Sequence, residues 1–206
     1  INELTNLYNK KKFNVIIEAY YNNRVLCHKG LNIVATSFKA TNNIEKSVEI
    51  YSESIDLDSN FWPSLLNRGL AYFELRSFQK AFEDFSKANE IAPNNHSIIF
   101  SLGSTLEKLK KNNDAIKCYL KVINIKKDFE PSYISLAELQ SKNNKNEAAL
   151  KTLNNLIHVN IDHDIAHYNK GNILQKLGRY SQAIKCYDKA ISINPNLYQS
   201  FSNAGT

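Results

Sequence analysis

The sequence predicts an all-α protein, built as a solenoid of antiparallel helix pairs, because one pattern returns every 34 residues. Small residues stand 34 positions apart without a gap, at Ala35, Gly69, Gly103, Ala137, Gly171 and Gly205. The sequence can be divided into 34-residue frames that begin at His28, Trp62, His96, Glu130 and Asp164, and further positions then match from frame to frame. We call each set of matching positions a column. The twentieth residue of these frames is Ser or Ala, the twenty-fourth is aromatic or Leu, and the thirtieth is aliphatic. A unit of this length buries its apolar face only against its neighbours, which predicts a stacked array.

Each frame reads as two helices joined by a polar turn. The twentieth and twenty-fourth residues are four positions apart and therefore share one helical face. A small residue at the eighth and twentieth positions allows two helix axes to approach to about 8 Å, and the twenty-fourth residue fills the space beyond that contact. Pro63 and Pro131 stand second in their frames, where a starting helix needs no N–H. Pro93 and Pro195 stand near the ends of their frames, where proline stops the second helix.

The repeat also predicts how the chain is divided. Five tandem repeats cover residues 28–197, as 28–61, 62–95, 96–129, 130–163 and 164–197. In residues 1–27, the segment from Asn2 to Asn23 reads as a degenerate helix pair that is out of register and caps the array. Residues 198–206 match the start of one further, truncated repeat. Because the chain begins at Ile1, contains no methionine and ends within a repeat, we expect it to be part of a longer protein.

Composition and charge narrow the class of partner. The chain is 43% apolar and 22% charged, as in soluble folded proteins, and no stretch approaches the roughly 18 apolar residues of a membrane span. The net charge of +6 comes from 22 lysines and only 4 arginines, whereas phosphate recognition favours arginine, so we predict no nucleic-acid partner and no membrane partner. The three cysteines match no metal or redox spacing, which indicates a reducing, cytoplasmic location.

The columns of Gly/Ala, Ala, aromatic and Pro residues resemble the tetratricopeptide repeat, and the resemblance runs from Lys29 to Thr206. It implies a right-handed superhelix whose concave wall is lined by the first helix of each repeat, and a protein or peptide segment as the partner. Two departures stand out. Arg68 and Lys170 occupy the seventh position, where the family has a bulky apolar residue. The frame from Glu130 carries several polar residues at packing positions, which predicts the loosest packing there: Gln140, Asn143 and Asn146.

The resemblance also names candidate binding residues on the concave wall. The sixth column contains Asn67, Ser101, Ser135, Asn169 and Asn203. An asparagine both donates and accepts hydrogen bonds, so a ladder of them is suited to peptide units. It resembles the asparagine ladder of O-linked N-acetylglucosamine transferase; the alternative is that these side chains are only solvated. Other candidates from the groove columns are Phe73, Phe100, Tyr168 and Asn172, of which the aromatic ones are either ligand anchors or packing residues.

The sequence contains no recognisable catalytic, metal or cofactor site. It has no glycine-rich phosphate loop, no nucleophile elbow and no paired metal motif, so we predict that this chain is not an enzyme and holds no cofactor. The nearest candidate for a metal is a group of three histidines, His158, His163 and His167. His163 lies in the turn between repeats and His167 occupies a packing position, so we predict no metal. The lysine–asparagine clamp with which some family members bind a C-terminal carboxylate is also missing: Tyr168 stands one turn before Asn172.

Two hypotheses about function follow. In the first, the chain is a protein–protein interaction scaffold that binds a partner segment in its concave groove. In the second, it is the substrate-recognition arm of a larger bacterial sulfo-, glycosyl- or methyltransferase whose catalytic domain lies outside this chain. Such transferases open with short stretches similar to NELTNLYNKKKF and then continue into repeats. The sequence does not predict an oligomeric state.

Overall fold

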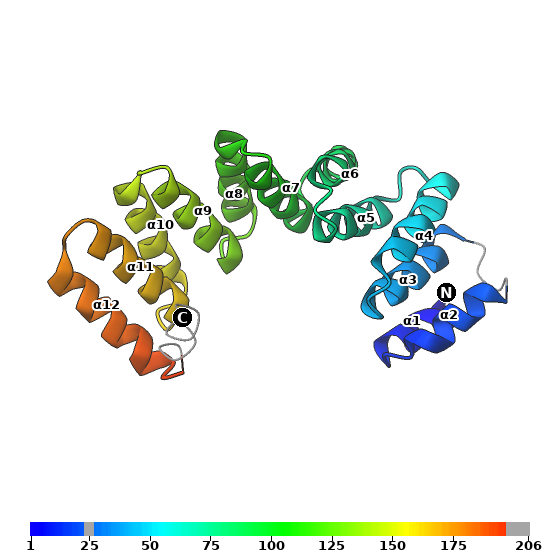
Figure 1. Cartoon of the computed structure of the whole chain (residues 1–206), viewed down its shortest axis with the longest axis horizontal. Helices are drawn as coiled ribbons and strands as arrows, with labels where there is room; N and C mark the ends of the chain where they lie inside the picture. Colours follow the sequence, from blue (N-terminus) through cyan, green and yellow to red (C-terminus); the bar gives the residue numbers. More distant parts are fainter. Residues whose placement is uncertain (23–26, 197–206) are drawn as a thin grey trace. The chain divides into compact units, whose positions relative to one another are not determined.

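The computed structural model describes residues 1–22 and 27–196, which form helices and contain no strand. Figure 1 shows neighbouring helices joined by short turns. The predicted all-α fold of antiparallel helix pairs is therefore confirmed. The helices are α1 (Asn2–Asn9), α2 (Phe13–Tyr21), α3 (His28–Ala40), α4 (Ile44–Leu57), α5 (Trp62–Glu74), α6 (Phe78–Ile91), α7 (His96–Lys108), α8 (Asn112–Ile125), α9 (Glu130–Lys142), α10 (Asn146–Val159), α11 (Asp164–Lys176) and α12 (Tyr180–Ile193).

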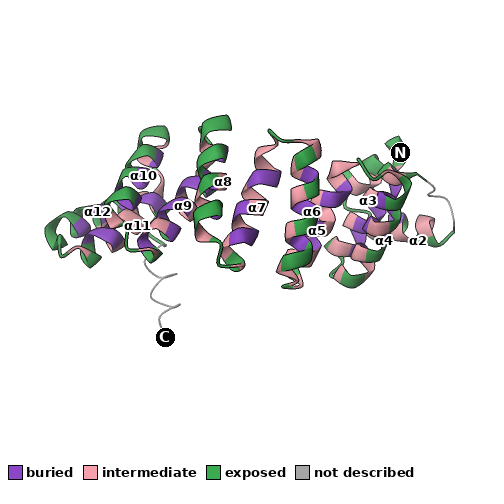
Figure 2. Cartoon of the chain, turned by 90° about the horizontal axis from the view of Figure 1, so that it is seen from above, coloured by how far each residue is buried: buried purple, intermediate pink, exposed green. Residues whose placement is uncertain are grey.

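The chain consists of two compact units, Ile1–Ala115 and Ile116–Thr206, which divide within α8. We call them unit 1 and unit 2. In Figure 2, buried and exposed residues alternate along most of the labelled helices, whereas α1 contains no buried residue. In unit 1, α1 and α2 pack through Ile16 and flanking apolar residues on Val34 and Phe38 of α3. In unit 2, one apolar cluster joins α9 and α10 to α11 and α12.

The starts of the helices recur at fixed positions of the frames. The first helix of each frame begins at the first residue of that frame, and the second helix begins sixteen residues later. Pro63 and Pro131 lie in the first turns of α5 and α9. Both α6 and α12 end two residues before their proline, Pro93 or Pro195. The second helices of the other frames end at the same position without a proline, so proline is compatible with this end but does not set it.

One turn geometry joins the two helices of every frame. The fifteenth residue has a left-handed backbone, with φ of 62° at Asn42, 58° at Arg76, 60° at Lys110, 59° at Asn144 and 71° at Gly178. The N–H of the following residue donates to the carbonyl oxygen five residues earlier, as in a Schellman motif.

The N-terminal helix pair contains the same turn. Lys11 has a φ of 54°, and the N–H of Lys12 donates to the carbonyl oxygen of Leu7 at 2.9 Å. Residues 2–21 therefore form a helix pair that is joined by the same turn but has shorter helices than the pairs of the repeats. The second helix starts at Phe13, 31 residues before Ile44 instead of 34, so this pair is out of register with the array.

The small residue of the eighth column faces the aromatic side chain of the twenty-fourth. A Cβ atom added to Gly69 would lie 2.6 Å from Cε1 of Phe85, and one added to Gly171 would clash with Cε1 of Tyr187. The ring thus packs directly on the glycine, whereas the sequence predicted that it fills space beyond the helix contact. The frame that has Ala137 in this column carries the smaller Leu153 opposite.

Arg68, which departs from the family pattern, forms a buried ion pair. Its guanidinium donates to both carboxylate oxygens of Asp84, at 2.7 and 2.9 Å, and to the hydroxyl of Ser52 at 2.9 Å. Asp84 is buried, with 7% of its side chain exposed. Because Ser52 belongs to α4 and Asp84 to α6, Arg68 joins two consecutive frames.

The polar residues of the frame from Glu130 bond to one another. The hydroxyl of Thr152 donates to Oε1 of Gln140 at 2.8 Å, and the hydroxyl of Ser141 donates to Oδ1 of Asn146 at 3.2 Å. The two compact units divide in the frame before this one, so the division does not coincide with the polar residues that predicted loose packing.

Candidate functional site

In unit 1, the predicted ladder residue Asn67 belongs to a hydrogen-bond network between frames. Its Nδ2 donates to Oδ1 of Asn32 at 3.0 Å, and the hydroxyl of Ser64 donates to the same oxygen at 3.2 Å. Ser64 in turn lies 2.7 Å from the hydroxyl of Ser54, inside the protein. The network joins α3, α4 and α5, so one donor of Asn67 is already used to hold two frames together.

In unit 2, the equivalent residue Asn169 has no such partner. Its Nδ2 is buried and finds no hydrogen-bond acceptor among the described residues. The sequence explains the difference, because the position that holds Asn32 in the first frame holds the apolar Ile134 in the fourth. We call the Nδ2 group of Asn169 the open donor.

The remaining ladder residues are Ser101, Ser135 and Asn203. Ser101 lies half-buried on α7 in unit 1, and Ser135 lies half-buried on α9 in unit 2. Asn203 lies outside the described residues. Among the described ladder residues, Asn67 and Asn169 therefore show the contrast between a used and an open donor.

The candidate aromatic residues are half-buried. The ring of Phe73 lies edge-on to Phe78 with 5.3 Å between centroids, and the ring of Tyr168 lies 5.7 Å from that of Tyr187. Both partners belong to the second helix of the same frame, so Phe73 and Tyr168 have a packing role. Phe100 is half-buried on α7.

Asn172 is fixed by a contact with the second helix. The hydroxyl of Tyr187 lies 2.9 Å from Oδ1 of Asn172 and 2.9 Å from Oε1 of Gln175. Burial raises the pKa of Tyr187, so the hydroxyl keeps its proton and donates. With Oδ1 directed at the hydroxyl, the amide nitrogen of Asn172 is the group left to bind a ligand.

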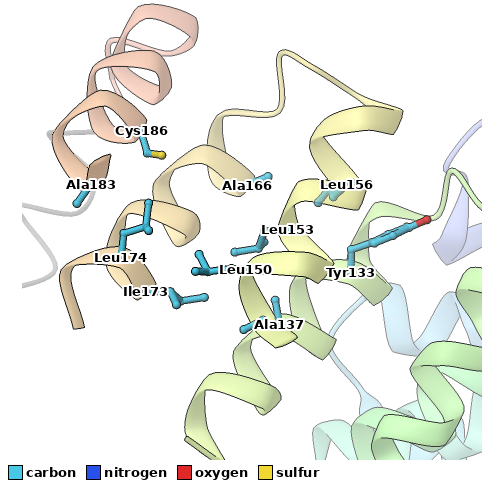
Figure 3. Packing of buried hydrophobic residues seen from close by; sticks show 11 residues of the cluster. Tyr133, Ala137, Leu150, Leu153, Leu156, Ala166, Ile173, Leu174, Ala183 and Cys186 are labelled. Atoms are coloured by element: carbon cyan, nitrogen blue, oxygen red, sulfur yellow. The ribbon is translucent and has the colours of Figure 1, made fainter. Parts of the chain in front are cut away.

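Asn169 and Asn172 line one cavity of about 180 Å³ between α9 and α11. Its lining includes Ala137 and Ile173, which also belong to the core cluster of unit 2 and lie near each other in Figure 3. The structure thus brings together two of the predicted site residues, beside apolar ones. The full lining is Ala137, Glu138, Ser141, Lys142, Asn169, Asn172, Ile173 and Lys176.

Four polar residues of this cavity are not among the site residues predicted from the sequence: Glu138, Ser141, Lys142 and Lys176. They occupy the ninth, twelfth and thirteenth positions of their frames, which the family resemblance places on the concave wall. The thirteenth column reads Lys108, Lys142 and Lys176 in the last three frames. Reading that column together with the sixth would have indicated a basic rim beside the asparagine.

The histidines near α11 serve the local backbone. Nδ1 of His163 accepts from the N–H of Ala166 at 3.2 Å and caps the helix, while Nε2 lies 3.3 Å from a carboxylate oxygen of Glu130. Nε2 of His167 lies 3.0 Å from the carbonyl oxygen of Ile161. Within residues 1–22 and 27–196, no three His, Cys, Asp or Glu side chains converge on a point suited to a metal ion. None of the helices in this part of the chain is long and apolar enough to cross a membrane.

The geometry defines an all-α repeat protein with a small, mostly apolar cavity between α9 and α11. Comparison of the sequence with known families agrees: residues 63–95, 96–129 and 165–197 each match the tetratricopeptide repeat. The chain therefore contains tetratricopeptide repeats over residues 63–129 and 165–197. No curated protein matches it in sequence.

Solved structures show the same fold at low sequence identity. A crystal structure of MamA has a TM-score of 0.74 at 16% identity and covers 81% of this chain and 97% of its own. MamA from Desulfovibrio magneticus RS-1 (residues 41 to the end) has a TM-score of 0.75 at 16% identity, covering 82% and 96%. YrrB, described as a TPR protein with an unusual peptide-binding site, has a TM-score of 0.70 at 19% identity, covering 93% and 98%.

Proposed function

We propose that this chain is a non-catalytic scaffold that binds a segment of a partner protein along its first helices, with the cavity between α9 and α11 as a contact point. The open donor of Asn169 supports this most directly. A buried N–H without an acceptor costs about 1–3 kcal/mol, and native proteins keep few of them. An acceptor on a bound segment would remove that cost once the side chain of Asn169 turns its amide toward the cavity that this residue lines.

The size of the cavity supports a peptide over a cofactor. Small-molecule sites usually enclose about 300–1,000 Å³. A cavity of about 180 Å³ has room for one amino-acid side chain. A tetratricopeptide protein of the same fold, YrrB, is described as having a peptide-binding site, which agrees with this class of ligand.

The proposal is tested with synthetic hexapeptide pools, acetylated and amidated so that no terminal charge remains. Six extended residues span about 20 Å, enough for two frames. Binding of the pools is measured by fluorescence anisotropy on the wild-type chain and on Asn169→Leu. We expect Asn169→Leu to bind roughly threefold to tenfold more weakly, since it lacks one hydrogen bond, and to fold as stably as the wild type.

Two further variants control this experiment. Asn67→Leu removes the matched asparagine whose donor is already used by Asn32, so it should lower stability and leave pool binding unchanged. Ile134→Asn places an acceptor where Asn32 stands in unit 1, which should close the open donor and weaken binding. Binding that is equal in the wild type and Asn169→Leu, or absent altogether, would contradict the proposal.

The recognition arm of a larger transferase stays our second hypothesis, and the comparisons above do not support it. The sequence that follows Thr206 in the full gene decides it, because a sulfo-, glycosyl- or methyltransferase motif there would place a catalytic domain next to this array. A bacterial, cytoplasmic protein without nucleic-acid affinity also stays a prediction. An affinity for RNA or DNA that falls steeply with salt concentration would contradict the prediction that the protein does not bind nucleic acid.

A further inference from the structure

The residue before the first helix of each frame satisfies the N–H groups of that helix in one of two ways. In three frames its side chain accepts a hydrogen bond from the third helical N–H, as Cys27, Asn95 and His163 do at α3, α7 and α11. In the other two frames it is a phenylalanine without a side-chain hydrogen bond, and proline removes the N–H of the second helical residue. The two arrangements alternate from frame to frame. His163 therefore fills at α11 the place that Asn95 fills at α7.

His163 differs from Asn95 because its acceptor atom can take up a proton. Nδ1 accepts from the N–H of Ala166 at 3.2 Å, and Nε2 lies 3.3 Å from a carboxylate oxygen of Glu130. A neutral imidazole has one donor and one acceptor, so this geometry assigns the proton to Nε2 and the lone pair to Nδ1. A second proton would occupy Nδ1, and the N–H of Ala166 would then face another donor. The helix cap and the doubly protonated ring therefore exclude each other.

Glu130 holds the ring from its other side. One carboxylate oxygen of Glu130 accepts from Nδ2 of Asn160 at 2.8 Å, and the other faces Nε2 of His163. Only 10% of the His163 side chain is exposed, so the ring is enclosed between the start of α9 and the start of α11. Protonation leaves the Nε2–H directed at Glu130 and turns this contact into an ion pair. The added proton thus exchanges a hydrogen bond within α11 for a stronger one between frames.

The other titratable groups near this contact belong to α10, to the turn before α11, to α11 itself and to α12: His158, Asp162, Asp164, His167 and Lys189. His158 is exposed at the end of α10. Asp162 pairs with Lys189 at 3.1 Å, and Asp164 accepts from Asn194 at 2.7 Å. His167 bonds to a backbone carbonyl oxygen. In the part of the chain that the structure describes, Glu130 is therefore the charged group that contacts the ring of His163.

We propose that His163 is a proton-sensitive cap of α11. The neutral ring caps the helix; in acid, Nδ1 takes a proton from the solvent, the hydrogen bond from Ala166 breaks, and the first turn of α11 loosens. Histidine side chains ordinarily change charge between pH 5 and 8, which sets the range of the experiment. The inference adds a regulatory device to the array and does not depend on the proposed function.

The test follows the whole chain by NMR between pH 8 and pH 5. Long-range ¹⁵N correlations report which ring nitrogen of His163 carries the proton. Hydrogen exchange, corrected for the intrinsic effect of pH, reports the protection of the Ala166 amide. We expect the proton on Nε2 at pH 8 and a roughly fivefold loss of protection at Ala166 that follows the titration of the ring. The Ile98 amide, which Asn95 caps at 3.3 Å, is the internal control and should keep its protection.

Two variants separate the cap from other effects of acid. His163→Asn supplies the acceptor that Asn95 supplies at α7, and this acceptor takes up no proton, so Ala166 should stay protected over the whole range. His158→Asn, at an exposed histidine of α10, is the matched control and should retain the pH dependence of the wild type.

Three results would overturn the inference. A neutral ring with its proton on Nδ1 would show that Nδ1 does not accept from Ala166. Protection of Ala166 that stays constant from pH 8 to pH 5 would show that acid does not release the cap. An equal loss of protection in His163→Asn would assign the sensitivity to another group. None of these results depends on binding of the hexapeptide pools, so the proposed function is tested separately.

Discussion

At the scale of single residues, the contact between the eighth and twenty-fourth columns explains why small residues recur every 34 positions. At Gly69 and Gly171 a ring lies where a methyl group would stand. The frame with Ala137 accommodates its methyl group opposite the smaller Leu153. The first frame, however, holds Ala35 together with the aromatic Tyr51 in one buried cluster, so the twenty-fourth residue does not by itself decide between glycine and alanine.

The first prediction concerns the pair of Gly69 and Phe85. Gly69→Ala should lower the free energy of unfolding by about 1–3 kcal/mol, because the added Cβ would lie 2.6 Å from the ring. The double variant with Phe85→Leu recreates the Ala137/Leu153 pair, so it should lose less stability than the two single variants together. Urea unfolding of the four proteins measures the coupling, expected to be about 1 kcal/mol or more. Strictly additive costs would argue against this contact.

The second prediction concerns the alkaline limit of stability. Burial raises the pKa of Tyr51 well above its ordinary value of 10.0, and the hydroxyl of Thr36, at 3.0 Å, offsets this only in part. The folded state therefore holds this proton more tightly than the unfolded state. Stability should be unaffected by Tyr51 below about pH 10 and should fall above it, by up to about 1.4 kcal/mol per pH unit.

Unfolding free energies from pH 8 to 11 check this prediction. Tyr51→Phe should lack the part of the alkaline decline that arises from the hydroxyl, while Tyr180→Phe, at a tyrosine that is 65% exposed, should retain it. Parallel pH profiles for the wild type and Tyr51→Phe would show that Tyr51 does not limit alkaline stability.

At the scale of helices and turns, the fifteenth residue of every frame has a left-handed backbone, although the residue type differs between frames. Gly178 adopts this backbone without strain, whereas Arg76 and Lys110 carry a Cβ atom that disfavours it. The turn is imposed by the helices on either side and by the Schellman hydrogen bond, because the residue itself does not prefer it in most frames.

The third prediction follows from this turn. Arg76→Gly should raise the free energy of unfolding by about 1 kcal/mol, because glycine relieves the left-handed strain. Gly178→Ala should lower it by a similar amount, since an added Cβ there meets nothing within 4 Å and only the backbone strain is introduced. Thermal or urea unfolding measures both. A loss of stability in Arg76→Gly would show that the arginine side chain matters more than its backbone.

The fourth prediction concerns the ion pair that joins two frames. Asp84→Ala should cost about 3–5 kcal/mol, because it leaves the guanidinium of Arg68 half-buried without its carboxylate. The double variant with Arg68→Leu, which restores the apolar residue of the family pattern, should recover most of that loss. A single variant that costs less than about 1 kcal/mol would show that solvent replaces the carboxylate.

At the scale of the whole molecule, the helix pairs could be predicted from sequence because each column repeats at a fixed period. Asn67 and Asn169 show where this reasoning ends: they share a column, yet one donor is used and the other is open. The difference arises from the neighbouring frame, which supplies Asn32 in one case and Ile134 in the other. A column read alone does not contain that information. The basic rim was missed for a similar reason, since Lys176 acts together with Ser141 of the preceding frame.

The central claim is that the Nδ2 group of Asn169 contributes to binding a partner and does not contribute to the stability of the fold. It is tested most directly by measuring, on the same samples, hexapeptide-pool affinity and unfolding free energy for the wild type and Asn169→Leu. We predict at least a roughly threefold loss of affinity with equal or higher stability, because the substitution removes a buried donor that the fold does not use. Unchanged affinity, or an affinity that falls only as the fold is lost, would contradict the account.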